Sequence, residues 1–400
     1  MSDRAVWVTG VGAVSAAGDG GDALLRLLLD GRSAVVPVPE LSGLGAGRAP
    51  TPRRKAHARH LDRSAGLFMA AGDEAWQTAG LAAEPPAPER TMLIEGSSLG
   101  PMADLLRWHE GRVTEAEPGL PRPSVLVRFM TGAGGAALAQ AHGIRGPVVH
   151  LSVGSVSAMA AIGEGYRKIL NGEADLVIAG GAECPLHPDI VASFHAAGIL
   201  APCDGGVPAC RPFDARRAGT VLGEGAGVVI LEAEEHARRR GAAPRAVVKG
   251  FGLVCEAHSF TAPDPTGAGV SAAVRQALGA LDTNQIGWIK THGTGTRAND
   301  LAECRGLAAV FGGGLVRAPL TSLKPALGHC LGASGAVEAV GAVLSLEVGA
   351  VPPTVNTEQI DPELPPCTVA TRPECSTTGA VLLLAESFGG RCAALVLERA

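Results

Sequence analysis

The chain has 400 residues, of which 46% are hydrophobic and 18% charged, so it can bury a substantial core and could hold two or three domain-sized units. Aromatic residues make up only 3% of the sequence and the formal net charge is −5, which argues against a general nucleic-acid-binding protein, because phosphate contacts need basic side chains and base stacking needs aromatic ones. The nine cysteines are an odd number without a closely spaced CxxC pair, so they predict neither a disulfide framework nor a zinc site, and we expect no metal.

The sequence opens with a short apolar run, residues 5–15 (AVWVTGVGAVS), that predicts a β-strand. This run lacks the charged region, long apolar stretch and cleavage site of a signal peptide. No apolar run approaches membrane-spanning length, and scattered single cysteines suit a reducing compartment. We therefore expect a cytoplasmic protein that does not enter a membrane.

A cluster of basic residues follows, and its members are Arg53, Arg54, Lys55, Arg59 and Arg63. Such a cluster is compatible with a solvated helix face and equally with a patch that steers an acidic partner through its electrostatic field. The sequence leaves both interpretations open.

Residues 151–166 (LSVGSVSAMAAIGEGY) place Ser155 at a turn into a helix of small residues. One interpretation is structural, because serine is a favoured N-cap that satisfies a free N–H group of the first helical turn. The other is a nucleophile, which would need a general base, because the partial charge of a helix terminus does not ionise a hydroxyl.

Two pairs of segments indicate an internal duplication. Residues 5–15 recur loosely as residues 246–256 (AVVKGFGLVCE), each opening one half of the chain. The small-residue helix after Ser155 is echoed by residues 330–345 (CLGASGAVEAVGAVLS), and both are apolar on most faces. Helices that are apolar all round are buried, so we expect both helices inside the molecule.

The strands predict how these helices are covered. Residues 175–180 and 227–232 are continuous apolar runs rich in β-branched residues, as expected for a sheet covered on both faces. We therefore expect an α/β protein built as a layered α/β/α/β/α sandwich. Its two halves should be residues 1–243 and 244–400.

Two histidine-glycine motifs carry the most specific chemical signal. They are Thr291-His-Gly-Thr-Gly-Thr296 and Lys324-Pro-Ala-Leu-Gly-His329. Together with the turn at Ser155 and the block of residues 211–227, they make the chain resemble the beta-ketoacyl-acyl carrier protein synthases (ketosynthases) of type II polyketide and fatty-acid synthases. The resemblance spans essentially the whole chain. It implies the thiolase fold, in which two pseudo-duplicated halves form the five layers.

The resemblance assigns roles to the polar residues of these motifs. His292 and His329 match the histidines that hydrogen-bond the thioester carbonyl of a malonyl-carrier protein and stabilise the enolate that forms when carbon dioxide leaves. Lys324 and Glu338 match the lysine and glutamate that order this cluster. The polar machinery is thus complete apart from the thiol.

The resemblance also implies a substrate carrier. Thr294 and Thr296 match threonines that hydrogen-bond the phosphopantetheine arm of acyl carrier protein, and Asp300 matches an acidic position after them. The arm would be the only cofactor, carried by the substrate and not by the chain. The basic cluster of residues 53–63 falls where the resembled enzymes dock the acidic carrier protein.

The chain departs from the family at its nucleophile and gates. Ser155 stands where the resembled enzymes carry a cysteine whose pKa is lowered by a helix N-terminus. Thr220 replaces a gating phenylalanine. In residues 384–392 (LAESFGGRC), Phe388 matches the movable phenylalanine of the gate, but Ser387 replaces the glycine before it, which restricts the backbone. Cys330, beside His329, is an alternative nucleophile, although the family commonly has leucine there.

These departures favour a subunit that does not condense by itself. A similar loss of the nucleophile and the gate is typical of the chain-length-factor subunits of type II polyketide synthases, although those subunits commonly lose the two histidines as well. We expect a heterodimer with an active, Cys-containing ketosynthase, in which a helix carrying Met102, Leu105 and Trp108 helps to close a shared acyl tunnel. A homodimer is the alternative.

Two further functions remain open. The chain could be an active acyltransferase or hydrolase that uses Ser155 as acyl acceptor and His292 or His329 as base, or a malonyl-carrier-protein decarboxylase that needs only the two histidines. A nucleotide-dependent protein has little support. The glycine-rich residues 10–15 lack the third glycine of a dinucleotide fingerprint, and residues 223–227 lack the lysine of a phosphate-binding loop.

Overall fold

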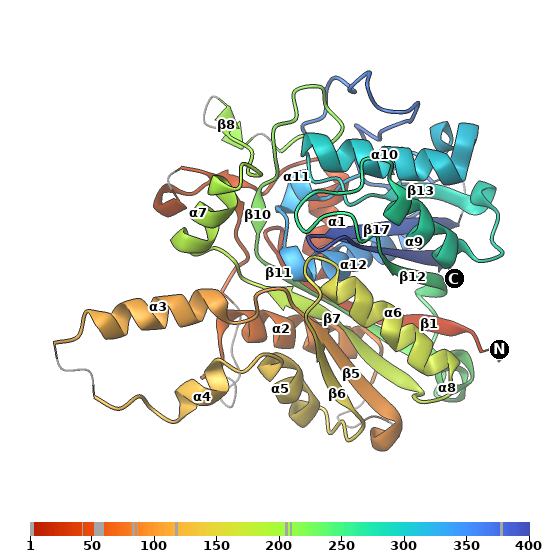
Figure 1. Ribbon diagram of the computed structural model, residues 1–400. Helices are drawn as coiled ribbons and strands as arrows, with labels where there is room; N and C mark the ends of the chain where they lie inside the picture. Colours follow the sequence, from red (N-terminus) through yellow and green to blue (C-terminus); the bar gives the residue numbers. More distant parts are fainter. Residues whose placement is uncertain are drawn as a thin grey trace.

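The computed structural model describes residues 4–41, 43–51, 60–81, 85, 87–116, 119–204, 207–208, 210–376 and 379–400. Two five-stranded halves form the framework (Figure 1). From its inner edge outward, the N-terminal half contains β1 (Val6–Ser15), β11 (Gly225–Ala233), β7 (Leu176–Glu183), β5 (Thr91–Gly96) and β6 (Val148–Leu151). The C-terminal half contains, in the same sense, β12 (Ala246–Cys255), β18 (Arg391–Arg399), β17 (Ala380–Ser387), β13 (Ile286–Lys290) and β14 (Leu320–Thr321).

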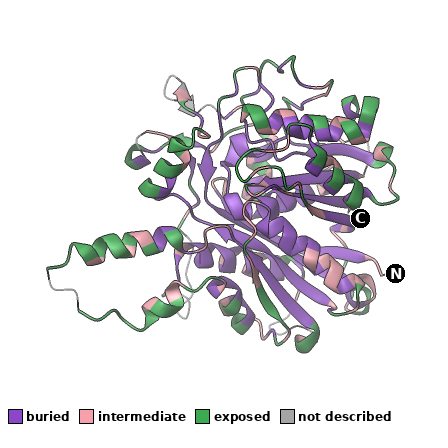
Figure 2. Cartoon of the chain, in the orientation of Figure 1, coloured by how far each residue is buried: buried purple, intermediate pink, exposed green. Residues whose placement is uncertain are grey.

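Helices form three layers around these strands. One outer layer packs on the N-terminal half and consists of α2 (Arg63–Thr78) and α5 (Ala133–Ala141). The opposite outer layer packs on the C-terminal half and consists of α9 (Ala268–Leu278) and α10 (Arg297–Phe311). Between the halves lie α6 (Ser157–Leu170) and α12 (Ser334–Val348), buried in the largest apolar cluster (Figure 2). The expected five-layered thiolase fold is confirmed.

Shorter elements complete the chain. The remaining helices are α1 (Gly21–Leu29), α3 (Met102–Val113), α4 (Ser124–Arg128), α7 (Pro188–Ala196), α8 (Glu234–Arg239) and α11 (Lys324–Leu327). The short strands are β2 (Gly18–Asp19), β3 (Val36–Pro37), β4 (Gly45–Gly47), β8 (Cys203–Asp204), β9 (Val207–Pro208), β10 (Leu222–Gly223), β15 (Ala350–Val351) and β16 (Glu374–Cys375). The predicted boundary between residues 243 and 244 falls between α8 and β12.

The two halves repeat each other in detail. β1 and β12 pair antiparallel and join the halves, and each strand has a register shift at the same point, between Val8 and Gly10 in β1 and between Val248 and Gly250 in β12. The equivalent residues are therefore 240 positions apart. The predicted alignment of residues 5–15 with 246–256 is wrong by one residue, because it matched the initial Ala-Val pairs and not the glycines at the bulges.

Small residues let the two central helices approach closely. A Cβ atom on Gly335 of α12 would lie 2.7 Å from the Cβ of Met159 in α6, closer than real Cβ atoms pack. This contact explains why both helices are rich in glycine and alanine. It also holds the N-terminus of α6 close to the segment that leads into α12.

One buried helix has the length and composition of a membrane span. The window Leu331–Val348, which includes α12, passes such a test, contrary to the expectation that no run of this length exists. However, 89% of the window is buried inside the molecule. The segment is therefore the core helix of this fold.

An arm formed by α3 and α4 projects from the body of the molecule (Figure 1). Most of its side chains are exposed, as the green colour shows (Figure 2). Several are large and apolar, and on the two helices these are Met102, Leu105, Val113, Leu126 and Val127; Leu120 and Met130, just before and after α4, are exposed as well. The arm is thus an apolar surface without a covering layer in the described part of this chain.

Candidate functional site

Ser155 lies in a tight turn just before α6. Gly154 adopts a left-handed φ of 70°, which favours glycine, and turns the chain so that the Ser155 side chain points toward the segment before α12. The helix begins later, with Val156 as N-cap and without a side-chain cap. The N-cap interpretation of Ser155 is therefore wrong, because its hydroxyl contacts His329 and not the helix backbone.

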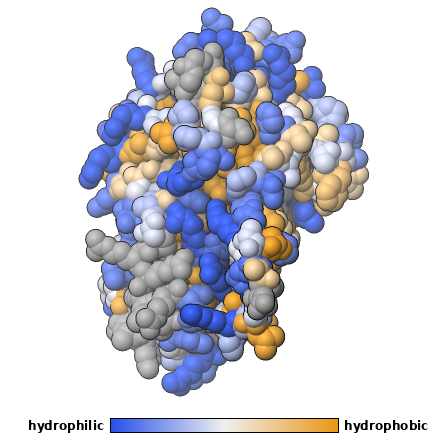
Figure 3. Space-filling view, turned by 90° about the vertical axis from the view of Figure 1, so that its left-hand side faces the viewer, coloured by the Kyte–Doolittle hydropathy of each residue, from blue (hydrophilic) through white to orange (hydrophobic). Residues whose placement is uncertain are grey.

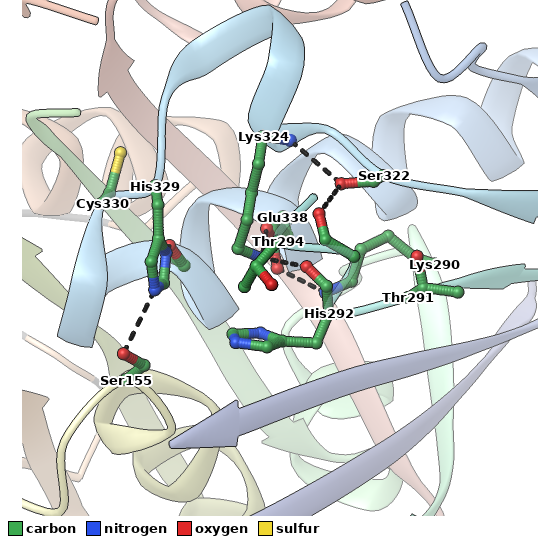
Figure 4. Close-up of polar contacts among 12 residues, drawn as sticks. Ser155, Lys290, Thr291, His292, Thr294, Ser322, Lys324, His329, Cys330 and Glu338 are labelled. Atoms are coloured by element: carbon green, nitrogen blue, oxygen red, sulfur yellow. Dashed lines mark hydrogen bonds and ion pairs between the residues drawn. The ribbon is translucent and has the colours of Figure 1, made fainter. Parts of the chain in front are cut away.

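His329 follows α11 and is fixed by its backbone and by its ring. Its N–H donates to the carbonyl of Val221 at 2.6 Å, and its own carbonyl accepts from the N–H of Gly223 at 2.9 Å. The ring lies between two serines. Its Nε2 lies 3.2 Å from Ser155 Oγ (Figure 4), and its Nδ1 lies 2.8 Å from Ser334 Oγ. The three side chains form a hydrogen-bonded chain in which His329 can accept the Ser155 proton at Nε2.

His292 lies beside His329, with the ring centroids 5.3 Å apart in an edge-to-face arrangement. Its backbone N–H donates to the carboxylate of Glu303, a buried residue of α10. Burial is the main cause that lowers the pKa of both imidazoles well below its usual range, and the positive charge of Lys324 adds to it. Both rings are therefore neutral near pH 7. His292 Nδ1 is buried and has no hydrogen-bond partner among the described residues.

A buried cluster of charges stands behind the histidines. Glu338 of α12 accepts from Lys324 Nζ at 2.9 Å with one carboxylate oxygen and from Lys290 Nζ with the other (Figure 4). Lys324 Nζ also donates to the His292 carbonyl at 2.5 Å. Glu338 is therefore shared by two buried lysines, and one of them also donates to the backbone of His292.

The carboxylate of Asp300 holds the loop of the first histidine motif through hydrogen bonds to backbone N–H groups. Asp300, in the first turn of α10, accepts from the N–H groups of Phe213 at 2.9 Å and Gly295 at 3.1 Å. Burial raises its pKa to about 6. Thr294 and Thr296 lie on this loop with their hydroxyls 3.0 Å apart.

Several of these side chains line one cavity of about 550 Å³. The predicted site residues that line it are Ser155, His292, Thr294, Thr296, His329 and Phe388. The predicted Lys324 and Glu338 do not line it but support the histidines from behind. The cavity thus unites the predicted acyl and carrier-arm positions.

The residues at the predicted gate positions also lie at this cavity. Phe388 is 45% exposed at the turn between β17 and β18. Ser387 Oγ accepts a hydrogen bond of 2.9 Å from the Ser155 N–H. The hydroxyl of Thr220 is buried without a partner among the described residues. The same is true of one carboxylate oxygen of Glu386, which directly precedes Ser387. Burial is the main cause that raises the pKa of Glu386 well above its usual range, so this acid is neutral near pH 7.

Three functional residues escaped the sequence reasoning. All three lie outside the two histidine motifs: Lys290 contacts Glu338, Ser334 contacts His329, and Glu303 contacts His292. Lys290 could have been predicted most easily, because a lysine at the end of the apolar strand β13, directly before the motif, needs a buried counter-ion.

The predicted docking cluster has only one member in the described structure. Arg53, Arg54, Lys55 and Arg59 lie outside the described residues. Arg63 is turned inward, donating to Glu224 at 2.8 Å and to the Ala49 carbonyl at 2.5 Å. The assignment of Arg63 to a surface patch is therefore wrong, because its charge is neutralised inside the molecule.

The predicted tunnel residues all lie on α3. Met102 is 42% and Leu105 41% exposed, and Trp108 packs edge-to-face on Phe129 with the centroids 5.5 Å apart. None of Met102, Leu105 and Trp108 lines the cavity of this chain. Their place in a tunnel stays a prediction that requires a partner subunit.

The alternative thiol is unsuited to catalysis. Cys330 is buried, and burial raises the pKa of its thiol. Its side chain points away from the His329 ring (Figure 4). Cys330 is therefore not a substitute nucleophile.

One group of potential metal ligands exists among the described residues. It consists of Glu110, His187 and Asp189. His187 Nδ1 accepts from the Asp189 N–H at 3.3 Å, and Nε2 lies 3.2 Å from Glu110 Oε1. Because Nδ1 accepts from the helix backbone and Nε2 lies within hydrogen-bond distance of Glu110, both ring nitrogens already have partners within the protein.

Comparison with known proteins agrees with this geometry. The chain matches the family models for the beta-ketoacyl synthase N-terminal domain over residues 3–237 and C-terminal domain over residues 245–358. It is 34% identical to the putative polyketide beta-ketoacyl synthase 1 of Streptomyces halstedii, over 99% of this chain and 98% of that protein. It is also 34% identical to 3-oxoacyl-[acyl-carrier-protein] synthase 2 of Vibrio cholerae, over 89% of both.

Solved structures are similar over the entire length. The ishigamide ketosynthase/chain length factor superposes with a TM-score of 0.90 at 29% identity, covering 100% of both chains. A type II polyketide synthase ketosynthase bound to its acyl-carrier protein, AntDE:AntF, gives a TM-score of 0.90 at 26% identity, again covering 100% of both.

Proposed function

Because the chain belongs to the beta-ketoacyl synthase family, we propose that it is a chain-length-factor-type subunit that pairs with a Cys-containing ketosynthase and shapes its acyl tunnel. The observation that carries the proposal is the hydroxyl at residue 155. Ser155 lines the cavity, and the resemblance assigns the nucleophile to this residue, but a hydroxyl ionises far less readily than a thiol. The same pocket that surrounds a thiolate in a condensing enzyme therefore does not produce an equivalent nucleophile here.

The surface of the chain supports a partner subunit. β6 ends the sheet, and its outer edge has no paired strand in the described part of the chain. Val148 and Val149 on this strand are 43% and 39% exposed. An exposed, apolar edge strand is a template for pairing with another chain. The arm of α3 and α4 adds further apolar groups, and hydrophobic residues interrupt the hydrophilic surface on the side from which it projects (Figure 3).

A heterodimer with a Cys-containing ketosynthase suits condensation better than a homodimer. A homodimer would contain two cavities with a serine at the nucleophile's position, whereas a heterodimer supplies a thiol from the partner. The similar ishigamide ketosynthase/chain length factor is itself such a pair. In the heterodimer, α3 would place Met102, Leu105 and Trp108 against the partner's acyl chain.

The cavity also suits the phosphopantetheine arm of acyl carrier protein. The hydroxyls of Thr294 and Thr296 line it and can hydrogen-bond amide groups of the arm. Arg391 lines the cavity, and its guanidinium group donates to the Phe388 carbonyl. Arg297 directly precedes the lining residues Ala298 and Asn299, and its guanidinium group donates to the Ala215 carbonyl. These cations can attract the phosphate of the arm and an acidic carrier protein. We place this assembly in the cytoplasm.

Native mass spectrometry tests the pairing. The chain is produced alone and together with a Cys-containing ketosynthase from the same source. A stable one-to-one heterodimer is expected, with the homodimer as the minor species. A homodimer that excludes the ketosynthase would contradict the proposal.

A second function is favoured by one specific distance. Ser155 Oγ lies 3.2 Å from His329 Nε2, within reach of a general base, so the serine could accept an acyl group from a carrier thioester. The two neutral histidines could also support decarboxylation of a malonyl thioester without any nucleophile. Intact-mass analysis after incubation with acyl-carrier protein separates the first case, because a covalent adduct should then form and should disappear in Ser155→Ala. Release of carbon dioxide without an adduct would identify the second.

A further inference from the structure

The end of β17 reaches across the fold to the turn that carries Ser155. Ser387, the last residue of β17, accepts a hydrogen bond through Oγ from the backbone N–H of Ser155, with N and O 2.9 Å apart. The contact is tight, because a Cβ atom on Gly154 would lie only 2.0 Å from Ser387 Oγ. The hydroxyl therefore rests directly on the turn, at the wall of the cavity.

The N–H that Ser387 engages has a general chemical use. When a side chain attacks a thioester carbonyl, the carbonyl oxygen becomes an oxyanion, and donors 2.7–3.1 Å away stabilise it. The backbone N–H of the attacking residue is often one of these donors. At residue 155 this donor is already occupied by a group of the protein itself.

We propose that Ser387 is an inhibitory positioning residue, whose hydroxyl holds the Ser155 N–H and so removes an oxyanion donor from the acyl site. The inference rests on the proposed function in one respect, namely that residue 155 does not take part in condensation. It identifies the Ser387 hydroxyl as a group that suppresses acyl transfer to residue 155. Because the hydroxyl acts on the backbone N–H, acyl transfer should be suppressed whether residue 155 carries a hydroxyl or a thiol.

The backbone of Ser387 is held separately from its hydroxyl. Ser387 pairs with Arg391 in the antiparallel ladder between β17 and β18. Removing only the hydroxyl therefore leaves the strand in place while it frees the N–H. This separation distinguishes a block by hydrogen bonding from a block by restricted backbone motion, which would be relieved only by glycine.

The test uses the variant Ser155→Cys, alone and combined with Ser387→Ala or Ser387→Gly. The probe is the N-acetylcysteamine thioester of octanoic acid. The introduced thiolate attacks the thioester carbonyl carbon, a new S–C bond forms, the bond to the cysteamine sulfur breaks, and the leaving thiolate takes up the proton that His329 received from the attacking thiol. The rate of adduct formation is followed by intact-mass analysis.

Alkylation of the same variants with iodoacetamide is the matched control. It consumes the same thiolate by direct displacement and forms no oxyanion, so it reports access and folding but not the oxyanion donor. We expect Ser387→Ala to raise the acylation rate about tenfold to a hundredfold. The alkylation rate should stay within about twofold, because the thiolate and its access are unchanged.

Three results would overturn the proposal. Acylation that does not rise in Ser387→Ala shows that the hydroxyl does not block the site. Equal increases in acylation and alkylation show that Ser387 only limits access. An increase confined to Ser387→Gly shows that backbone restriction is the cause. None of these results depends on pairing with a ketosynthase, so the proposed function can fail in native mass spectrometry while this inference stands, and the reverse also holds.

Discussion

Gly10 and Gly250 occupy equivalent positions in the two halves of the fold, and each lies against a carbonyl of the helix that covers its strand. A Cβ atom on Gly10 would lie 2.2 Å from the carbonyl oxygen of Ala75 in α2. A Cβ atom on Gly250 would lie 2.0 Å from that of Ala277 in α9. The same close contact between strand and helix is therefore used twice.

Replacement of either glycine by alanine should destabilise the protein to a similar degree. The added methyl group must displace backbone, so we expect Gly10→Ala and Gly250→Ala each to lower the free energy of unfolding by about 1–3 kcal/mol or more. Gly111 in the exposed α3 is the control, because no heavy atom lies near its Cβ position. Gly111→Ala should be neutral or stabilise by up to about 1 kcal/mol through helix propensity. Urea unfolding at fixed protein concentration measures all three, and a Gly10→Ala variant as stable as Gly111→Ala would contradict the equivalence.

Glu338 should be essential for stability. Glu338→Gln leaves the buried ammonium groups of Lys324 and Lys290 without their counter-charge. Removing one partner of a buried ion pair costs about 3–5 kcal/mol.

The control for this variant is Glu234→Gln, which removes a surface ion pair with Arg238 in α8. Pairs of this kind contribute about 0–1 kcal/mol. If urea unfolding shows equal losses for the two variants, the charge cluster does not hold the histidine motifs together.

Acid should destabilise the protein through its buried histidines. The folded pKa of His292 lies well below the value of about 6.5 expected in an unfolded chain. As pH falls, the unfolded chain takes up this proton first, so stability is lost below pH 6.5. Between pH 7.5 and 5.5 the loss is about 1.4 kcal/mol for one such histidine.

The variant His292→Gln should therefore lose about 1.4 kcal/mol less than the unsubstituted protein over this pH range. Parallel stability curves for the unsubstituted protein and His292→Gln would mean that His292 is not held neutral by burial.

Arg63 should matter for folding and not for carrier docking. Arg63→Met strands the buried carboxylate of Glu224 and should cost about 3 kcal/mol or more in urea unfolding. The affinity of the folded variant for acyl carrier protein, measured by titration calorimetry, should stay within about twofold. A loss of affinity without a loss of stability would return Arg63 to the docking surface.

The central polar residues were predictable because two contiguous motifs contain His292, Lys324 and His329, and the family resemblance supplied Glu338. The structure brings these four together. The buried central helices were also predictable, since their composition alone indicates burial on all faces.

The contacts that decide the chemistry at Ser155 were not predictable. Ser155 is 174 residues from His329 and 232 from Ser387, so no local pattern shows either hydrogen bond. Its interpretation as an N-cap failed because the start of α6 depends on the turn at Gly154, which shifts the cap to Val156. Arg63 was misjudged for a related reason, since its partner Glu224 lies 161 residues away.

Product length in a reconstituted synthase tests the central claim most directly. The chain is combined with a Cys-containing ketosynthase, acyl carrier protein and malonyl units, and products are compared for the unsubstituted chain, Leu105→Trp and Ser155→Ala, with Val113→Trp as a control at the far end of α3. A tunnel-shaping subunit predicts shorter products for Leu105→Trp and unchanged products for Ser155→Ala and Val113→Trp. Loss of product in Ser155→Ala, with unchanged length in Leu105→Trp, would contradict the account and make the chain an acyl-transfer enzyme in its own right.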